Sequence, residues 1–359
     1  MQQRYVVIMA GGLGTRFWPI STSQMPKQFL DVLGLGRSLL QQTYDRIAPL
    51  FQPEHIFVST HSSHQALVKA QLPHLPLHQI ICEPYRKNTA PGIAFAANKL
   101  HALNPHATAL FLPSDHLVLN NEAFQAAVSS CFESAETQPG LYTIGITPHR
   151  PDTGYGYIQF RKHTAESKMH QVKTFTEKPN AELAQSFLDS GDFLWNAGIF
   201  VWGLNTILQA LALHDTELYN LFNTSEHVYN TPLETAFAER AFAASKNLSI
   251  DYSVLEKAQN VWVCKSDFGW SDLGTWGSLY EQLKKDENQN VVSGKHILLY
   301  DCKNAFIQIP KDKIAVVQGL NNVIVVEKDN VLLICSKDQE QMIRTFVNDV
   351  KVKKGERYV

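Results

Sequence analysis

Short apolar runs alternate with amphipathic segments along the first two-thirds of the chain. The runs rich in Val, Ile and Phe predict β-strands, at Tyr5–Ala10, His55–Thr60, Gln79–Glu83, Ala107–Leu112, Leu141–Ile146, Tyr155–Phe160, Gln171–Glu177, Ala197–Trp202 and Val261–Ser266. The segments between them predict helices, at Leu39–Ala48, His64–Gln71, Gly92–Leu103, Glu122–Ser134, Ala181–Leu188, Leu204–Leu211, Leu233–Ala244 and Thr275–Lys285. Near-continuous apolar strands separated by helices predict an α/β fold, with a mostly parallel sheet and helices on both faces. Ligands of such sheets bind beyond the carboxyl ends of the strands, so functional residues should follow strands.

The pattern changes after about Asn290. Strand-like runs then begin about eight or nine residues apart, near Ile297, Ala305, Ile314, Val323 and Val331, and no helix is predicted before Gln339. This spacing predicts a small all-β unit, either a meander or a few coils of β-solenoid, followed by a terminal helix. We therefore expect two domains, residues 1–289 and 290–359. The exposed ends of so short a solenoid suit homodimer contacts or capping of the main domain.

Composition and charge narrow the function. The chain has 359 residues, 44% of them hydrophobic, and a net charge of −2, so no long-range field attracts nucleic acid or an anionic membrane. Five scattered cysteines without a C-x-x-C motif indicate reduced thiols. No apolar stretch approaches the roughly 18 residues of a membrane span, and the start lacks a signal-peptide core. We expect a cytoplasmic protein with neither nucleic acid nor membrane as a partner.

The first predicted strand ends in a glycine-rich loop, VVIMAGGLGTRFWP. The loop lacks the Lys-Ser or Lys-Thr of a P-loop, and Phe17 stands where the dinucleotide fingerprint needs its third glycine. A tight turn without a ligand is the plain alternative. However, Arg16 and Lys27 follow the glycines, and bare backbone amides flanked by two cations suit a triphosphate.

The motif G-G-x-G-T-R-x-x-P followed by P-K-x-[FL]-L resembles the signature of the sugar-1-phosphate nucleotidylyltransferases. FWPIS…MPKQFL is similar to the mannose-1-phosphate guanylyltransferase branch of that family. Further motifs resemble the family in its order, namely CEPYRKNTAP, LPSDH, TGYGYI, FTEKP, WNAGIF and FGWSDLGTW. The resemblance spans about 290 residues of this sequence. It implies a Rossmann-like fold of the nucleotide-diphospho-sugar transferase type with a β-helix-like C-terminal unit.

Two aspartates follow predicted strands. Asp115 comes after ATALFLP, and Asp272 lies in the turn GWSDLGTW. Each could be only a helix N-cap, as could Ser114. Two carboxylates also suit Mg²⁺, which fills the rest of its octahedron with water and phosphate oxygens. The resemblance implies that Asp115 and Asp272 are the Mg²⁺ ligands.

The resemblance also implies the substrate contacts. It places the nucleoside at the Ala10–Gly12 backbone, the triphosphate at Gly14 and Thr15, the leaving pyrophosphate at Arg16, and the α- and neighbouring phosphates at Lys27. Further nucleotide contacts are expected at Glu83, Asn88, Thr89 and Ser114. Lys178 is expected on the sugar phosphate, with sugar contacts at Gly154, Tyr155, Glu177, Asn196 and Gly198. A surface ion pair is the plain alternative for Glu177 and Lys178, and an ordinary turn for the glycines.

The resemblance implies an enzyme that joins GTP and α-D-mannose 1-phosphate into GDP-mannose, with release of diphosphate and without a covalent intermediate. The nearest alternative is the same reaction with another sugar 1-phosphate or nucleoside triphosphate. A non-catalytic nucleotide-sugar sensor on the same fold should lack Arg16, Lys27, Asp115 or Asp272, and all four are present. A nicotinamide-dependent dehydrogenase should carry the third glycine, which is absent.

Overall fold

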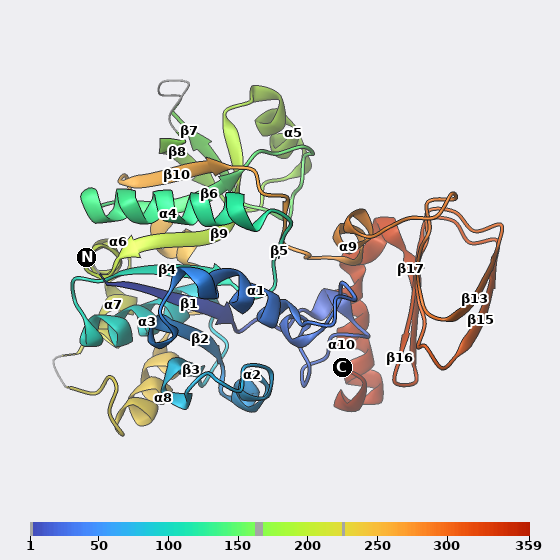
Figure 1. Cartoon of the computed structure of the whole chain (residues 1–359), viewed down its shortest axis with the longest axis horizontal. Helices are drawn as coiled ribbons and strands as arrows, with labels where there is room; N and C mark the ends of the chain where they lie inside the picture. Colours follow the sequence, from blue (N-terminus) through green and yellow to red (C-terminus); the bar gives the residue numbers. More distant parts are fainter. Residues whose placement is uncertain (1–2, 162–167, 225–226) are drawn as a thin grey trace. The chain divides into compact units, whose positions relative to one another are not determined.

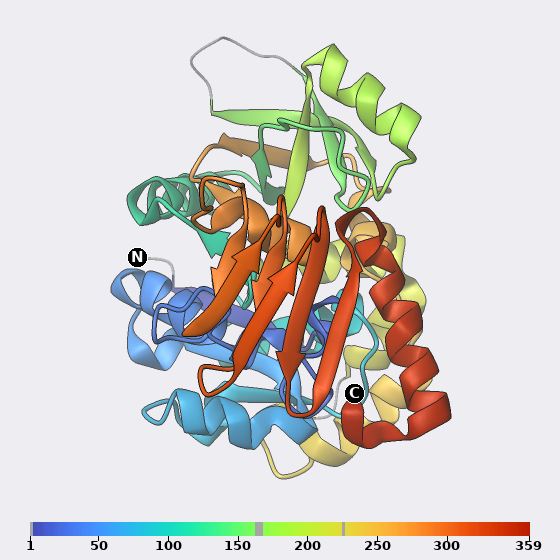
Figure 2. The same cartoon turned by 90° about the vertical axis from the view of Figure 1, so that its right-hand side faces the viewer.

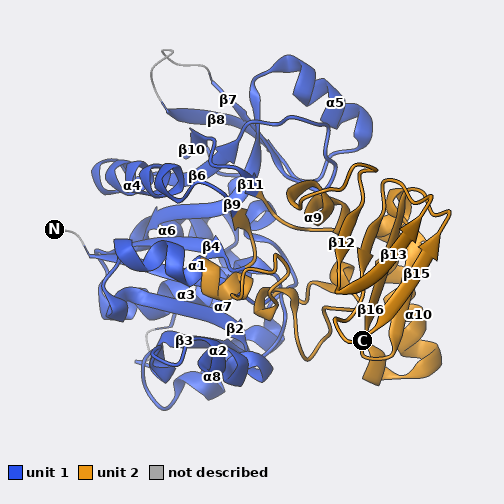
Figure 3. Cartoon of the chain, turned by 45° about the vertical axis from the view of Figure 1, so that its right-hand side comes forward, with its two compact units in different colours: residues 1–11, 43–114, 118–270 blue, residues 12–42, 115–117, 271–359 orange. Residues whose placement is uncertain are grey.

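The computed structural model describes residues 3–161, 168–224 and 227–359. The chain forms two compact units, shown in different colours in Figure 3. The first comprises residues 1–11, 43–114 and 118–270, and the second comprises residues 12–42, 115–117 and 271–359. The boundary falls between Gly11 and Gly12, so the glycine-rich loop from Gly12 onward belongs to the same unit as the C-terminal part of the chain. The division into a domain of residues 1–289 and a domain of residues 290–359 stays a prediction.

A nine-stranded sheet forms the centre of the first unit (Figure 1). Its strands are β1 (Arg4–Ala10), β2 (Ile56–His61), β3 (Ile80–Glu83), β4 (Thr108–Pro113), β6 (Leu141–Ile146), β7 (Tyr157–Phe160), β8 (Met169–Thr176), β9 (Phe193–Gly203) and β10 (Val261–Ser266). Their order is β3-β2-β1-β4-β9-β6-β10-β8-β7. The pairs β1–β2, β1–β4, β2–β3 and β6–β10 are parallel, whereas β9 runs antiparallel to β4, β6 and β7.

The expected α/β fold is confirmed, and each predicted strand of this sheet overlaps an observed one. The helices of this unit are α2 (Gln65–Gln71), α3 (Thr89–Leu103), α4 (Asn121–Thr137), α5 (Ala181–Ser190), α6 (Leu204–His214), α7 (Thr216–Phe222) and α8 (Glu234–Ala244). Tyr5 and Val7 of β1 share one apolar cluster with α3, α6, α7 and α8. Val6 and Ile8 point to the other face, because side chains alternate along a strand. α4 packs on β4, β6, β9 and β10 without joining that cluster.

The strand order changes direction at β1, which has β2 on one side and β4 on the other. Ala10–Gly11 lie at the carboxyl end of β1, Glu83 ends β3, and Ser114 follows β4. The Ser114 amide donates to the Met9 carbonyl at 3.1 Å. A crevice beside such a switch point is where open α/β sheets bind ligands.

The β part of the second unit is a short solenoid (Figure 2). Its strands are β12 (Val291–Ser293), β13 (His296–Tyr300), β14 (Phe306–Gln308), β15 (Ile314–Gln318), β16 (Val323–Lys328) and β17 (Val331–Ser336). β12, β14 and β16 pair in parallel, as do β13 and β15, and β17 turns back antiparallel to β16. Parallel pairing between successive coils fits a solenoid and excludes a meander, in which neighbouring strands would all be antiparallel.

The loop that follows β1 packs against the C-terminal helix of the same unit. Phe17 and Trp18 share an apolar cluster with Ile343 and partly buried residues of α10 (Ile343–Lys354), and with Trp276 of α9 (Trp276–Gln282). α1 (Leu39–Ile47) runs from this unit into the first one, and the two-residue strands β5 (Leu117–Val118) and β11 (Trp270–Ser271) mark two further crossings. Among the described residues, no helix is long and apolar enough to cross a membrane.

Candidate functional site

The glycine-rich loop is held by side chains of its own segment. The Gly12 carbonyl accepts a hydrogen bond from Gln28 Nε2 at 2.9 Å, and the Leu13 carbonyl accepts one from Ser21 Oγ at 3.0 Å. Gly14 has a φ of 61°, and a Cβ added there would lie 2.5 Å from Lys27 Cβ. Only glycine fits this position, because the backbone is left-handed and the lysine lies against it.

Lys27 is enclosed by oxygen atoms. Its side chain is 5% exposed, and Nζ lies 2.7 Å from Asp115 Oδ2 and 2.9 Å from each of the Asp272 and Leu273 carbonyl oxygens. An ammonium has three donors, so the protein satisfies all of them. A carboxylate oxygen of Asp115 and the main-chain carbonyls of Asp272 and Leu273 therefore surround the Lys27 ammonium.

Asp115 is held in its ionised form. Burial alone would raise its pKa, but the Lys27 charge, His116 and the Lys27 hydrogen bond outweigh burial and lower the pKa. The helix that follows, α4, is capped by Asn120, whose side chain accepts from the Ala123 amide at 3.0 Å. The N-cap alternative for Ser114 and Asp115 is thus wrong.

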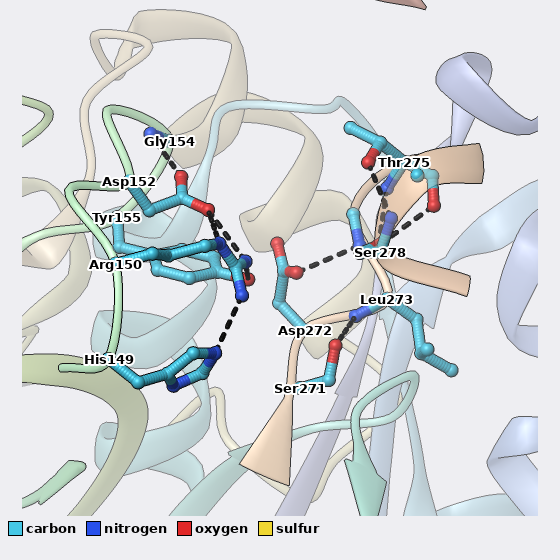
Figure 4. Close-up of polar contacts among 12 residues, drawn as sticks. His149, Arg150, Asp152, Gly154, Tyr155, Ser271, Asp272, Leu273, Thr275 and Ser278 are labelled. Carbon is cyan, nitrogen blue, oxygen red and sulfur yellow. Dashed lines mark hydrogen bonds and ion pairs between the residues drawn. The ribbon is translucent and has the colours of Figure 1, made fainter. Parts of the chain in front are cut away.

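Asp272 lies in a strained turn (Figure 4). Its Oδ1 accepts from the Gly274 amide at 2.8 Å, while Leu273 has a φ of 44° and is fully buried. A left-handed backbone conformation costs free energy for a leucine. The carbonyl of this same Leu273 accepts a hydrogen bond from Lys27 Nζ. Thr275, in a capping box with Ser278, is the N-cap of α9, so the cap alternative for Asp272 is also wrong.

The chemistry of these donors fits a hard divalent cation. Asp115 and Asp272 offer oxygen ligands, and the ammonium of Lys27 already lies against a carboxylate oxygen of the first and a carbonyl oxygen of the second. Within residues 3–161, 168–224 and 227–359, no group of three or more His, Cys, Asp or Glu side chains could hold a metal. A cation bound by two aspartates would complete its coordination with phosphate oxygens and water.

Glu83 is a buried carboxylate at the carboxyl end of β3. Ser59 Oγ donates to its Oε1 at 2.7 Å, and a Cβ added at Gly92 would lie 2.9 Å from the same oxygen. Burial raises the pKa of Glu83 to about 7, although the Ser59 hydrogen bond and the Arg86 charge oppose the shift. Burial of a carboxylate costs free energy, and a buried carboxylate with a raised pKa is a candidate for a functional role.

The loop after β3 leads to Thr89, whose contact with Ile250 the sequence did not reveal. Asn88 caps α3 with its side chain, in a backbone conformation with a φ of 67°. Thr89 Oγ1 accepts from the Ile250 amide at 2.9 Å. The side-chain oxygens of both predicted nucleotide residues are therefore engaged within the protein.

A second polar cluster of the first unit joins the predicted sugar residues. Glu177 and Lys178 form an ion pair directly after β8, and Lys178 has a φ of 47°. Its amide donates to the Tyr155 carbonyl at 3.2 Å, and a Cβ added at Gly156 would lie 2.4 Å from Glu177 Oε2. Apart from Lys178 and Leu273, the described non-glycine residues with positive φ are Asn, Asp or Gln. Both exceptions lie in predicted substrate motifs, which is typical of functional sites.

Asn196 is fixed from several sides. Its main-chain N–H donates to the Gly156 carbonyl at 2.8 Å. Its side-chain Oδ1 accepts from the Gly198 amide at 3.1 Å and from Thr143 Oγ1 at 3.3 Å. Its Nδ2 donates to Asp251 Oδ1 at 2.9 Å. Asp251 was not predicted from the sequence, because IDYS has no composition that distinguishes it from an ordinary helix start.

Arg150 is another residue that the sequence analysis missed. Its guanidinium donates to Asp152 Oδ2 at 2.7 Å and to Tyr155 OH at 3.3 Å (Figure 4). It also lies 5.2 Å from the ring centre of Trp195. Asp152 Oδ1 in turn accepts from the Gly154 amide at 2.8 Å. These contacts hold the loop that carries Gly154 and Tyr155. The R-P-D before T-G-Y-G was the available signal.

Arg16 has a cationic neighbour in the second unit. Burial and the Arg16 charge lower the pKa of Arg344, which follows Ile343 at the start of α10. Ile343 and Phe17 belong to one apolar cluster, so the residues next to them come close together. Two guanidinium groups in one neighbourhood favour an anion.

The structure thus gathers the predicted residues into sets within each unit. Gly12, Gly14, Lys27, Asp115 and Asp272 belong to the second unit, together with Thr15 and Arg16. In the first unit, Tyr155, Glu177, Lys178 and Asn196 form one set with Gly154 and Gly198, while Ala10, Gly11, Glu83 and Ser114 end neighbouring strands.

Comparison with known proteins agrees with these motifs. The nucleotidyl transferase family model matches residues 5–289, and that of the MannoseP isomerase/GMP-like beta-helix domain matches residues 294–350. A mannose-1-phosphate guanylyltransferase of Escherichia coli is 34% identical over 351 residues, which cover 95% of this chain and 74% of that protein. One of Salmonella muenchen is 35% identical, with 98% and 74% covered.

A solved structure from Thermus thermophilus, of a protein named mannose-1-phosphate geranyltransferase, superposes with a TM-score of 0.84. It is 29% identical and covers 98% of this chain and 100% of its own. Enzymes of the matched family generally use a divalent metal ion. The chain belongs to the nucleotidyl transferase family, and its C-terminal part matches the MannoseP isomerase/GMP-like beta-helix domain.

Proposed function

We propose that the protein is a mannose-1-phosphate guanylyltransferase, which converts GTP and α-D-mannose 1-phosphate to GDP-mannose and diphosphate in the cytoplasm. The observation that carries the proposal is that the Lys27 ammonium contacts the Asp115 carboxylate and the Asp272 carbonyl within one unit, which also contains the glycine-rich loop from Gly12 onward. The names of the relatives support the choice of substrates.

In the proposed reaction, a phosphate oxygen of the sugar phosphate forms a bond to the α-phosphorus of GTP. The bond between that phosphorus and the bridging oxygen breaks, and pyrophosphate leaves with its electron pair. Both reactants are anions, so the main tasks are alignment and charge neutralisation. No proton needs to be removed from the attacking phosphate oxygen, which is already ionised.

The chain's own groups divide these tasks. Arg16 would neutralise the leaving pyrophosphate, and the nearby Arg344 adds positive potential. Lys27 would hold the reacting phosphates, which requires it to exchange at least one of its protein acceptors for a phosphate oxygen. Mg²⁺, held by Asp115 and Asp272, would supply Lewis-acid stabilisation of the phosphate charge. Ser114 and the backbone from Ala10 to Thr15 would line the nucleotide.

Selectivity for guanine would come from Glu83. Guanine offers an N1–H and an amino group as donors, and a carboxylate is an acceptor that pairs with both. The glycine at position 92 leaves room for this carboxylate, and Ser59 orients it. Asn88 and Thr89 would contribute through their placement of the loop that follows Glu83.

The sugar phosphate would bind at the second cluster. Lys178, which is 60% exposed, would exchange its pairing with Glu177 for the phosphate. Glu177 would then accept hydrogen bonds from sugar hydroxyls, and Asn196 would donate to one. Gly154, Tyr155 and Gly198 would let the ring approach the backbone.

A homodimer belongs to the same proposal. β13 and β15 present Leu298, Tyr300, Ile314 and Val316 on an exposed face, with Leu298 opposite Val316. An apolar face of this kind on a two-stranded sheet can cover itself in a twofold pair. The proposal expects a particle of twice 40.4 kDa by light scattering. A monomer at micromolar concentration would remove this part of the proposal.

The test of the reaction is a matrix of nucleoside triphosphates against sugar 1-phosphates with Mg²⁺, read as released pyrophosphate. Release that needs both GTP and mannose 1-phosphate supports the proposal. Faster release with another pair would favour the alternative of the same reaction on other substrates.

A further inference from the structure

The segment Leu248–Asp251 joins two parts of the first unit. The Leu248 amide donates to the Lys87 carbonyl at 3.2 Å, and the Leu248 carbonyl accepts from the Ala90 amide at 3.1 Å. The Ile250 amide donates to Thr89 Oγ1 at 2.9 Å. The backbone before Asp251 is therefore fastened to the loop after β3, which fixes where the Asp251 side chain begins.

Asp251 starts a π-helical turn, Asp251–Leu255, whose last three residues are buried. Its Oδ1 accepts the hydrogen bond from Asn196 Nδ2 at 2.9 Å, across 55 positions of the sequence. π-helical turns are rare and often occur at functional sites. The carboxylate thus reaches the proposed sugar cluster from an element that carries none of the predicted site residues.

This contact determines what the Asn196 amide can offer a ligand. Its Oδ1 already accepts from the Gly198 amide and shares the single hydrogen of Thr143 Oγ1 with the Ile199 carbonyl, and one Nδ2 hydrogen is given to Asp251. A carboxylate can only accept, so Asp251 forces Nδ2 and not Oδ1 toward itself. Among the residues that the structure describes, no acceptor takes the second hydrogen of Nδ2, which is therefore a donor of fixed direction.

A second carboxylate lies close to Asp251. Burial raises the pKa of Asp251 to about 6, and the Glu177 charge adds to the shift, whereas the hydrogen bonds from its own amide and from Ser249 and the Lys178 charge oppose it. The charged groups that face Asp251 are therefore Glu177 and Lys178. The carboxylates of Asp251 and Glu177 can both accept hydrogen bonds from hydroxyl groups. The second Nδ2 hydrogen of Asn196 is the donor of fixed direction in this cluster.

We propose that Asp251 is a positioning residue of the sugar subsite, which fixes the Asn196 amide so that its remaining hydrogen reads one hydroxyl of the hexose. The inference rests on the proposed function, because it takes the ligand of this cluster to be a sugar 1-phosphate. Asp251 acts through Asn196 and contributes to the choice of sugar, not to the transfer of the nucleotide.

The experiment compares Asp251→Ala and Asp251→Asn with the wild type, with both substrates varied. Asp251→Ala is expected to raise the KM for mannose 1-phosphate roughly tenfold, the usual cost of a hydrogen bond to a charged group, and to leave the KM for GTP within about twofold. Asp251→Asn keeps an acceptor and should restore most of the loss. Glu239→Gln, on an exposed position of α8, is the matched control for charge.

The pH profile separates positioning from simple structural support. In the wild type, the KM for mannose 1-phosphate should rise as the pH falls through about 6, because protonation weakens the hold on Asn196. In Asp251→Asn this rise should be smaller. Equal increases of both KM values in both variants, or an unchanged KM for mannose 1-phosphate in Asp251→Ala, would overturn the inference. Wild-type protein without turnover of any sugar 1-phosphate would instead overturn the proposed function and the inference with it.

Discussion

Replacement of Glu83 by glutamine should make the protein more stable in neutral solution and a poorer user of GTP. The side chain is buried, and its pKa rises from 4.5 to about 7. Between these values the folded protein binds a proton that the unfolded chain does not bind. The free energy of unfolding of the wild type therefore falls as the pH rises through this window.

The size of the effect follows from the shift. One pKa unit corresponds to 1.36 kcal/mol, so a shift of this size changes the free energy of unfolding by about 2.5 kcal/mol between pH 5 and pH 8. Glutamine stays neutral and can still accept from Ser59, as Glu83 does. The stability of Glu83→Gln relative to the wild type should thus increase by about that amount between the two pH values.

Urea unfolding followed by tryptophan fluorescence at pH 5 and pH 8 measures this difference. Glu239→Gln, an exposed charge of the same unit, should show no such change. A difference for Glu83→Gln that is the same at both pH values would refute the reasoning about burial. The KM for GTP should rise about tenfold at pH 8, since a charged acceptor is lost. An unchanged KM would refute the role in base recognition.

Three further changes test the rest of the site. The double variant Asp115→Ala, Asp272→Ala should lose Mg²⁺-dependent turnover, and full activity in a pyrophosphate assay would show that the metal assignment is wrong. Lys178→Ala should raise the KM for mannose 1-phosphate more than that for GTP, and the reverse order in steady-state kinetics would contradict its role. Gly14→Ala should lower stability by about 1–3 kcal/mol in urea unfolding, because its φ is 61° and the added Cβ meets a buried lysine. Gly12→Ala has no atom within 4 Å of the added Cβ and is the control, so equal losses would contradict the steric argument.

The strands and helices of the sheet were predictable because burial on both faces leaves long apolar runs in the sequence. The antiparallel direction of β9 was not predictable, because an apolar run such as WNAGIFVW does not indicate whether the strand lies parallel or antiparallel to its neighbours. The helix α7, which begins two residues after the end of α6, was not predicted as a separate helix. The solenoid could be told from a meander only by the pairing of its strands.

The site residues that belong to recognisable motifs were predictable from the sequence. The contacts that form between distant parts of the chain were not. The enclosure of Lys27 depends on carbonyls whose directions follow from a left-handed Leu273, and no sequence pattern announces that conformation. Asp251 reaches Asn196 from a distant part of the chain, so its role needs the structure. The glycines beside Glu83, Glu177 and Asp272 leave space for these carboxylates, which the sequence shows only as turns.

The most direct test of the central claim is the release of pyrophosphate by the purified protein with Mg²⁺, GTP and mannose 1-phosphate. The account predicts release only when both substrates are present, with formation of an equal amount of GDP-mannose. Release from GTP alone, or none from this pair while another nucleotide and sugar phosphate react, would contradict it.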